Sequence, residues 1–210
     1  MPIRPFSGNT FVAFIDISGF KLMMNNNNIA LRALTQFYQA GYDALDENGS
    51  VQGFFVSDCG ILFSDHHDST IQMDELLIAI KQINRRMLTH DIMLTTSICY
   101  GHFSYTSKLE FQGIDKNPIY GDAYLNAYLD NANGKPKIEP GQCRILLQGI
   151  EEDQIAELMT NQFLLRKGHN HLYYYWSLND SIHIQAFESQ YKDSYNRKFL
   201  GMIEALKRNY

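Results

Sequence analysis

Two aspartates interrupt otherwise apolar stretches of this chain. Asp16 lies in "FVAFIDISGFK", residues 11–21, and Asp58 lies in "GFFVSDCGILFS", residues 53–64. Desolvating an unpaired carboxylate costs several kcal/mol, roughly, so neither is expected to be simply buried. A single aspartate here could cap the helix after Gly19 or occupy a turn. The pair, each at the end of a predicted strand, instead predicts one shared site.

Two carboxylates on neighbouring strands are the hard oxygen ligands that Mg²⁺ and Mn²⁺ prefer. Two such ions about 3.5–4 Å apart can activate an attacking hydroxyl and neutralise phosphate oxygens. The segment after Asp16 enters a helix, so its backbone N–H groups are expected to bind a triphosphate. The residues of this segment are Ile17, Ser18, Gly19 and Phe20, and Gly19 permits close approach of the backbone.

Alternating and helical patterns of apolar residues predict the elements that position this site. Strands are expected at 10–17, 92–105 and 143–148, a hairpin turning at Ser57-Asp58 within 51–64, and a second hairpin over 164–177. Helices are expected at 29–45, 74–88, 120–133 and 151–160, and from about 190 to 207. The order β-α-ββ-α-β, followed by α-β-α-β, predicts an α+β fold with a ferredoxin-like, antiparallel-rich sheet.

Composition restricts the class of protein. With 210 residues, 45% of them hydrophobic, the chain can bury one core, so residues 1–210 are expected to form a single domain. A net charge of −5 argues against nucleic acid or an anionic membrane as the main partner. Three cysteines without a CxxC spacing, and no signal peptide or membrane-spanning run, favour a cytoplasmic location without a thiolate zinc site.

Four motifs in this order resemble the class III nucleotidyl cyclase family. They are "FVAFIDISGF", "FFVSDCGILFS", "SICYGHF" and "YGDAYLNAYLDN", and together they span roughly residues 10–133. They look most like the short bacterial branch that includes the pyrimidine cyclases of the Pycsar antiphage system. The resemblance implies a catalytic core over about 10–133, a C-terminal extension over 134–210, and helices on one face of the sheet. It also implies a head-to-tail homodimer with active sites at the subunit interface.

The same resemblance implies a reaction and its residues. A nucleoside triphosphate would close into a 3′,5′-cyclic monophosphate and release pyrophosphate, with two divalent ions, Mn²⁺ or Mg²⁺, at each site. Asp16 and Asp58 would bridge both ions and the Ile17 backbone carbonyl would complete one site. The cyclic product would be a second messenger for antiviral defence, read by a downstream effector that senses cyclic nucleotides.

The chain departs from the family pattern in the helix after Gly121. The purine cyclases carry an Asn and an Arg there, where this chain has Leu125 and Leu129. Asn126 lies one residue away from the Asn position, and Asn131 stands where the short branch has Glu. Charge on the triphosphate must then be met by other cations, and the candidates are Lys21, Arg144, Arg166 and Lys167. Each is also readily explained as a solvated surface residue.

The base-reading position of the family, four residues before Asp58, is Phe54. Phenylalanine cannot hydrogen-bond a purine edge, and its bulk would narrow the pocket in favour of a pyrimidine. The second base-reading position is Pro118, which also has no side-chain donor. A pyrimidine nucleoside triphosphate is therefore expected as substrate. UTP is expected rather than CTP only because uridylate producers look commoner in the branch that the chain resembles, since Phe54 cannot distinguish the two bases. Phe54 and Phe55 could equally be ordinary strand residues that alternate between the two faces.

Two other functions stay open at this point. A cyclase-like module that dimerises and binds nucleotide without turnover would explain Leu125 and Leu129. A purine cyclase is disfavoured by Phe54. The "GHNH" stretch, with His169 and His171, is interpreted as a polar hairpin turn rather than a metal site.

Overall fold

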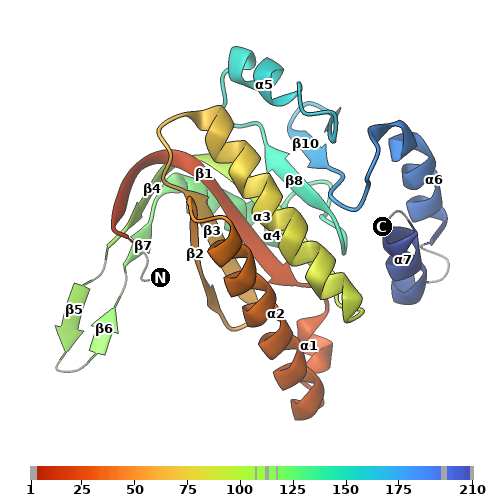
Figure 1. Cartoon of the computed structure of the whole chain (residues 1–210), viewed down its shortest axis with the longest axis horizontal. Helices are drawn as coiled ribbons and strands as arrows, with labels where there is room; N and C mark the ends of the chain where they lie inside the picture. The colour runs from red at the N-terminus through yellow and green to blue at the C-terminus, as the bar shows by residue number, and fades with distance from the viewer. Residues whose placement is uncertain (1–3, 107, 112–113, 117, 195–197, 209–210) are drawn as a thin grey trace.

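The computed structural model describes residues 4–208 except 107, 112–113, 117 and 195–197. Its centre is an eight-stranded sheet in the order β2-β3-β1-β4-β8-β10-β9, with β7 paired to β4 (Figure 1). The strands are β1 (Phe6–Ile17), β2 (Val51–Val56), β3 (Cys59–Ser64), β4 (Leu94–Tyr105), β7 (Ile119–Tyr120), β8 (Cys143–Leu146), β9 (Leu164–Lys167) and β10 (His171–Tyr174). Every pairing is antiparallel except β4 with β8.

β1 shows why the sheet is buried on both faces. Its side chains alternate, so Phe11, Ala13 and Ile15 belong to one apolar cluster, whereas Val12 and Phe14 belong to another. Helices cover both clusters, so β1 lies between two apolar layers. Its sequence is therefore almost continuously apolar, as expected for a central strand. Asp16 continues the series of Val12 and Phe14 and therefore emerges on their face.

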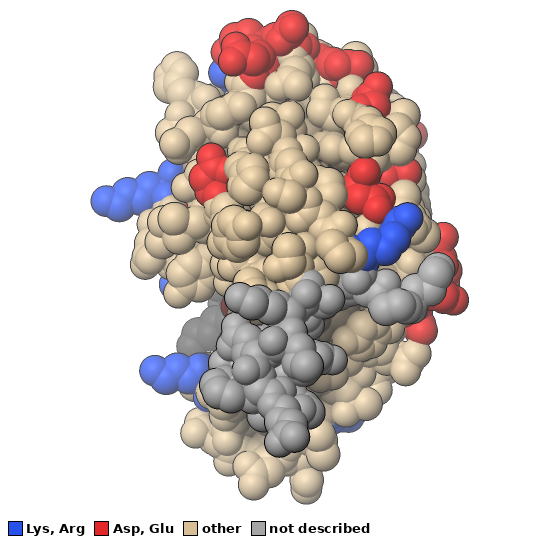
Figure 2. Space-filling view, turned by 90° about the vertical axis from the view of Figure 1, so that its left-hand side faces the viewer, with Lys and Arg blue, Asp and Glu red and all other residues tan. Residues whose placement is uncertain are grey.

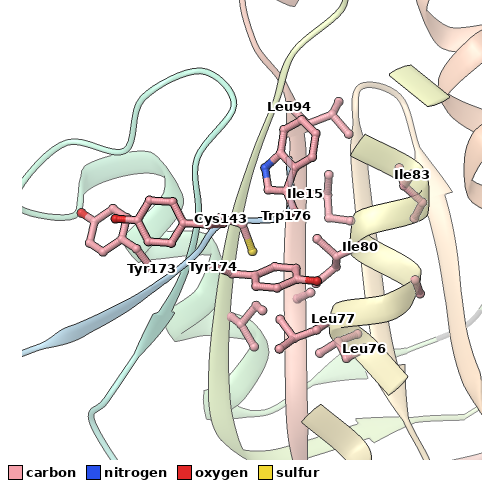
Figure 3. Close-up of a cluster of buried hydrophobic side chains, with 14 of the residues drawn as sticks. Ile15, Leu76, Leu77, Ile80, Ile83, Leu94, Cys143, Tyr173, Tyr174 and Trp176 are labelled. Atoms are coloured by element: carbon pink, nitrogen blue, oxygen red, sulfur yellow. The ribbon is translucent and has the colours of Figure 1, made fainter. Parts of the chain in front are cut away.

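The first face is covered by two long helices, α2 (Asn27–Glu47) and α3 (Ser69–Thr89). Both begin with side-chain caps: Asn26 accepts from the backbone of Asn28 and Ile29, and Asp68 accepts from Thr70 and Ile71. Figure 3 shows Leu76, Leu77, Ile80 and Ile83 of α3 pointing toward the sheet. These helices hold β1 and β3 in place, and short α1 (Phe20–Met23) follows β1 directly.

The opposite face is covered by α4 (Asp122–Asn133). Its small residues Ala123 and Ala127 are fully buried against Val12 and Phe14, so the helix lies close to the sheet. The ring of Tyr128 packs edge-on against Phe14 with 5.4 Å between centroids. The expected α+β cyclase fold is confirmed. The expectation of helices on one face is corrected, because α2 and α3 cover one face of the sheet and α4 covers the other.

The C-terminal residues continue the same sheet. After β8 come α5 (Glu152–Leu158) and the β9–β10 hairpin, followed by a 3-10 turn η1 (Ser181–His183), α6 (Ile184–Ser194) and α7 (Lys198–Lys207). The last two helices replace the single helix expected over 190–207, and the residues between them lie outside the described part. The structure adds α1, β7 and a small hairpin of β5 (Lys108–Phe111) and β6 (Ile114–Lys116), which were not expected.

Charged groups are sparse on the side of the molecule seen in Figure 2, where acidic side chains gather at the end that carries α5. Lysine and arginine side chains on that side are scattered singly rather than gathered in a stripe. No helix in the described residues is long and apolar enough to cross a lipid bilayer.

Candidate metal and nucleotide site

The turn between β2 and β3 aims Asp58 at β1. Val56 pairs with Cys59, so Ser57 and Asp58 form a two-residue hairpin loop. Ser57 adopts a left-handed φ of 54°, an uncommon conformation for a residue with a side chain. The Asp58 carbonyl accepts a hydrogen bond from the Ile17 N–H at 3.1 Å, which ties the turn to the end of β1.

Asp16, Asp58 and Cys59 form a compact group. Cys59 is directly opposite Asp16 in the β1–β3 register, and its thiol lies 3.5 Å from Asp16 Oδ1. One ligand atom from each of the three residues lies within 4.8 Å of the others. The two carboxylates therefore converge across a gap the size of a cation, as expected from the sequence.

The electrostatics of this group suit a divalent cation. Burial, followed by the charge of Asp58, raises the pKa of Asp16 from 3.8 to about 6. Burial and the two carboxylates likewise raise the pKa of the Cys59 thiol to about 12, so the sulfur stays protonated. Among the described residues neither carboxylate forms an ion pair with a lysine or arginine. The negative charge is thus left uncompensated, which is what a Mg²⁺ or Mn²⁺ site requires.

The segment after Asp16 is only partly available to a ligand. The Ile17 N–H donates to Asp58 and the Ser18 N–H donates to the Met93 carbonyl at 2.9 Å, so these two are used by the fold. Gly19 has a left-handed φ of 79° and begins α1. The Phe20 side chain is buried in the core. A triphosphate would therefore meet the backbone at Gly19 to Lys21 and the exposed Lys21 side chain.

Two buried polar atoms beside the carboxylates lack a hydrogen-bond partner in the described structure: Ser18 Oγ and Asn131 Nδ2. Asn131 Oδ1 accepts from Thr95 Oγ1 at 3.2 Å, and Thr95 is opposite Asp16 in the β1–β4 register. Buried polar groups are almost always paired in native proteins. Sequence reasoning noted Asn131 only as a departure, because its contact with Thr95 depends on how α4 packs.

Phe54 lies on the same face of the sheet as Asp16. The β2–β3 and β3–β1 registers place Phe54 beside Ile61 and Cys59 beside Asp16, all on the α4 side. The Phe54 ring stacks on Tyr105 with 5.7 Å between centroids. Phe55 points to the opposite face and packs edge-on against Phe37. The alternation expected of strand residues is present, and it directs Phe54 toward the carboxylate face.

The outer side of α4 is apolar and exposed. Leu125, Tyr128 and Leu129 are each close to half exposed, at 51%, 45% and 44%. Asn126 is half-buried on the same helix. No described residue of this helix is a cation, so α4 supplies no positive charge to the carboxylate site.

Most of the basic candidates are engaged elsewhere. Arg144 is fully buried and pairs with Asp130 through Nε to Oδ2 at 2.8 Å and Nη2 to Oδ1 at 2.9 Å. Arg166 pairs with Glu152, and Lys167 pairs with Glu188. The interpretation of Arg144 as a phosphate ligand or a surface residue is wrong. Lys21 is the exposed candidate that forms no ion pair within the described residues, and it belongs to α1, which follows β1 directly.

His171 is also not a polar turn residue. It begins β10, is buried, and its Nε2 lies 3.1 Å from Asp130 Oδ1. Burial alone would raise the pKa of Asp130, but hydrogen bonds from His171, Arg144 and Ser97 outweigh it and lower the pKa to about 2. The side chains of α4, β4, β8 and β10 meet in this buried network, which no spacing in the sequence indicates.

Comparisons with known proteins identify the fold. No family model matches the chain, and no curated protein matches it. Solved nucleotide cyclase domains do match in structure. The adenylyl cyclase CyaB from P. aeruginosa is 14% identical with a TM-score of 0.58, and the match covers 82% of this chain and 95% of that one.

Two guanylyl cyclase domains are similar to a comparable degree. The guanylate cyclase domain of RhGC from Catenaria anguillulae, solved with GTP, is 14% identical with a TM-score of 0.60 over 82% of this chain and 97% of that one. The monomeric guanylyl cyclase domain of RhoGC from Blastocladiella emersonii is 11% identical with a TM-score of 0.61, over 82% and 98%. The chain therefore has the fold of a class III nucleotidyl cyclase catalytic domain.

Proposed function

We propose that this protein is a metal-dependent nucleotide cyclase that acts on a pyrimidine nucleoside triphosphate, UTP or CTP. The observation that carries the proposal is the convergence of Asp16 and Asp58 within 4.8 Å, without a cationic partner in the described residues. That pair is held at adjacent strand ends within the fold of cyclase domains. An inert scaffold would gain nothing from two repelling carboxylates placed this way.

The residues present fit a divalent cation and a triphosphate. Asp16 and Asp58 would hold Mn²⁺ or Mg²⁺, with the Ile17 carbonyl as a further oxygen ligand. When bound, the cations would lower the pKa of the substrate 3′-hydroxyl and neutralise phosphate charge. The backbone at Gly19 to Lys21 and the Asn131 amide would orient the phosphates. The 3′-hydroxyl then gives its proton to solvent water and its oxygen bonds to the α-phosphorus, while the bond from that phosphorus to the bridging oxygen breaks and pyrophosphate leaves.

The preference for a pyrimidine rests on Phe54. Its ring lies on the carboxylate face and is fixed against Tyr105, so it presents bulk and no hydrogen-bonding group. A smaller base fits such a pocket better than a purine. The GTP in the solved RhGC domain belongs to that protein. A purine substrate for this chain is disfavoured by Phe54 and is tested alongside the pyrimidines.

A homodimer is part of the proposal because the carboxylate face is apolar around the site. Leu125 and Leu129 of α4 and Val56 beside the turn, which is 64% exposed, offer a surface that a second copy would cover. The partner would then supply groups that this face lacks. The cyclic product would act in the cytoplasm as a second messenger of antiviral defence, and its reader would be a separate effector.

The decisive experiment incubates the purified protein with each of the four NTPs and Mn²⁺ and analyses the products by mass spectrometry. A cyclic monophosphate from UTP or CTP, absent with Asp58→Ala, is the expected result. Gln39→Ala, in an exposed position on α2, serves as the matched control and should retain activity. A product that persists in Asp58→Ala would refute the metal assignment, and a product from ATP or GTP alone would refute the pyrimidine assignment.

The exposed Leu125 and Leu129 favour a second candidate, a cyclase-fold module that binds nucleotide without turnover. The same assay separates the two. Absence of any cyclic product, combined with Mn²⁺-dependent nucleotide binding measured by calorimetry, would identify the module.

A further inference from the structure

A cavity of about 570 Å³ lies in the C-terminal part of the sheet, away from the carboxylates. It opens where β8 begins and β10 ends, and α6 forms its outer wall. Its lining includes Tyr173, Tyr175, Trp176, Phe187 and Tyr191, and we call it the aromatic cavity. Its volume is within the range of small-molecule sites. Three strand spacings separate β10 from β1, about 14 Å, so it is distinct from the Asp16 site.

The polar ends of the aromatic residues are already satisfied by the protein. Trp176 Nε1 donates to the Gly141 carbonyl at 2.8 Å, the Tyr191 hydroxyl donates to the Pro140 carbonyl, and the Tyr175 hydroxyl donates to Glu188. These bonds fix the rings and leave their apolar faces toward the cavity. Phe187 stacks on Tyr191 and meets Tyr175 edge-on, which makes the α6 side a continuous aromatic wall. A preformed wall of this kind suits a flat ring.

The charged residues of the cavity are not equivalent. Lys167 is neutralised by Glu188 and lies over the Tyr173 and Tyr175 rings, at 4.8 and 5.5 Å from their centroids. Lys192 lines the cavity, is exposed, and forms no ion pair within the described residues, so it marks the mouth. One positive charge is therefore available there to a ligand.

Glu139 is the second charged group of the lining that forms no ion pair within the described residues. It is half-buried in the lining and receives a hydrogen bond from Gln142 Nε2 at 3.2 Å on Oε2. Burial raises its pKa, and the nearby Lys167 opposes that effect. A desolvated carboxylate with oxygen lone pairs to spare favours a ligand that donates N–H groups.

We propose that the aromatic cavity binds a planar heteroaromatic molecule that has N–H donors on one edge and an anionic substituent, the chemistry of a 5′-mononucleotide. The ring packs against the Phe187–Tyr191 wall, Glu139 accepts from the N–H edge, and Lys192 pairs with the phosphate. GMP is expected to bind most tightly of the four common mononucleotides, because N1–H and N2–H can donate side by side to one carboxylate. Binding requires neither Asp16 nor Asp58.

The chain contains a single tryptophan, Trp176, and it lines the cavity. Titration of AMP, GMP, CMP and UMP, with excitation at the red edge of the tryptophan band and EDTA present, reads out this cavity alone. The protein used carries Asp58→Ala, so that the carboxylate site contributes no metal-dependent binding. We expect saturable quenching, tightest for GMP, and about tenfold weaker binding of guanosine, which lacks the phosphate.

Two substitutions and a control assign the contacts. Glu139→Gln is expected to weaken GMP binding about tenfold, and Lys192→Gln to weaken GMP but not guanosine. Lys137→Gln, at an exposed lysine outside the lining, should leave both affinities unchanged. Absence of saturable quenching by all four mononucleotides would overturn the proposal. So would GMP affinities that are equal in the parent, Glu139→Gln and Lys192→Gln proteins. Because the assay measures binding in an Asp58→Ala background, it gives the same answer whether or not the protein is a cyclase.

Discussion

At the scale of single residues, Asp16 lies in an environment that works against the stability of the fold. Its carboxylate is partly desolvated and faces Asp58, so in the absence of metal the folded state raises its pKa to about 6 and holds the proton more tightly than the unfolded state does. Residues kept in such environments are common at functional sites, where stability is given up for chemistry.

The raised pKa of Asp16 predicts a pH dependence of stability. The folded pKa of about 6 exceeds the unfolded value of 3.8, so the stabilisation from this group is complete below 3.8 and is lost as pH rises through 6. Metal-free Asp16→Asn should therefore melt a few degrees higher than the parent at pH 7.5, and the difference should shrink at pH 4.5. Thermal melts in EDTA measure this. An equal difference in melting temperature between Asp16→Asn and the parent at both pH values would contradict this pH dependence.

Asn131 carries a second prediction at this scale. Its Nδ2 is buried without a partner, beside the strand position opposite Asp16. If it donates to substrate phosphate, Asn131→Ala should lower kcat/KM for the NTP about 10- to 100-fold, the value of a hydrogen bond to a charged group. The melting temperature should fall only modestly, because Nδ2 has no partner in the protein and the one hydrogen bond lost is the one that Oδ1 accepts from Thr95.

The control is Asn133→Ala, at an exposed position on the same helix. It should leave kcat/KM unchanged. Equal losses from Asn131→Ala and Asn133→Ala would mean that helix stability, rather than a contact with substrate, explains the effect.

At the scale of elements, local sequence patterns were sufficient to predict most of the helices and strands of the fold. The alternation along β1, the hairpin at Ser57-Asp58 and the periodicity of α2 and α3 all predicted elements that the structure contains. The nearness of Asp16 and Asp58 was predictable for a different reason, because a ferredoxin-like sheet places β1 beside the hairpin, and β1 does pair with β3. The burial of Arg144 and His171 was not, since it depends on α4 meeting β8 and β10 from distant parts of the chain.

The junction of β7 and α4 depends on Gly121. It has a φ of 135°, and a Cβ there would lie 2.1 Å from the His102 carbonyl oxygen. Gly121→Ala should therefore lower the free energy of unfolding by about 2 kcal/mol or more. Urea denaturation measures the change.

Gly49→Ala provides the comparison, because a Cβ at Gly49 meets nothing within 4 Å and its φ is not positive. That substitution should change the free energy of unfolding by no more than about 0.5 kcal/mol. If both substitutions lower the free energy of unfolding by similar amounts, the close approach of Gly121 to His102 does not explain the effect.

At the scale of the whole molecule, the Asp130 network joins the two parts that the sequence suggested. Asp130 belongs to α4, whereas Arg144 and His171 belong to β8 and β10. The division into a core over 10–133 and an extension over 134–210 stays a prediction, but strands from both parts lie in one sheet.

Removing one charge of the Asp130–Arg144 pair should lower the free energy of unfolding more than removing both charges. Asp130→Ala leaves a fully buried guanidinium without its carboxylate and should destabilise the fold by about 3–5 kcal/mol. The double variant Asp130→Ala, Arg144→Met removes both charges and should recover much of that loss. Urea denaturation of the parent, the single variants Asp130→Ala and Arg144→Met, and the double variant measures the coupling. If the double variant loses as much free energy of unfolding as the two single variants lose together, the proposed coupling between Asp130 and Arg144 is refuted.

The parallel pairing of β8 with β4 also affects how the chain is made. The ribosome delivers β4 long before residues 143–146, so Thr96 to Ile98 must wait with an unpaired backbone edge while α4 is synthesised. Such an edge is a template for pairing with another chain. Nascent molecules stalled or cleaved before β8 are therefore expected to be targets for chaperones or to aggregate, even though every residue of the carboxylate site has already emerged.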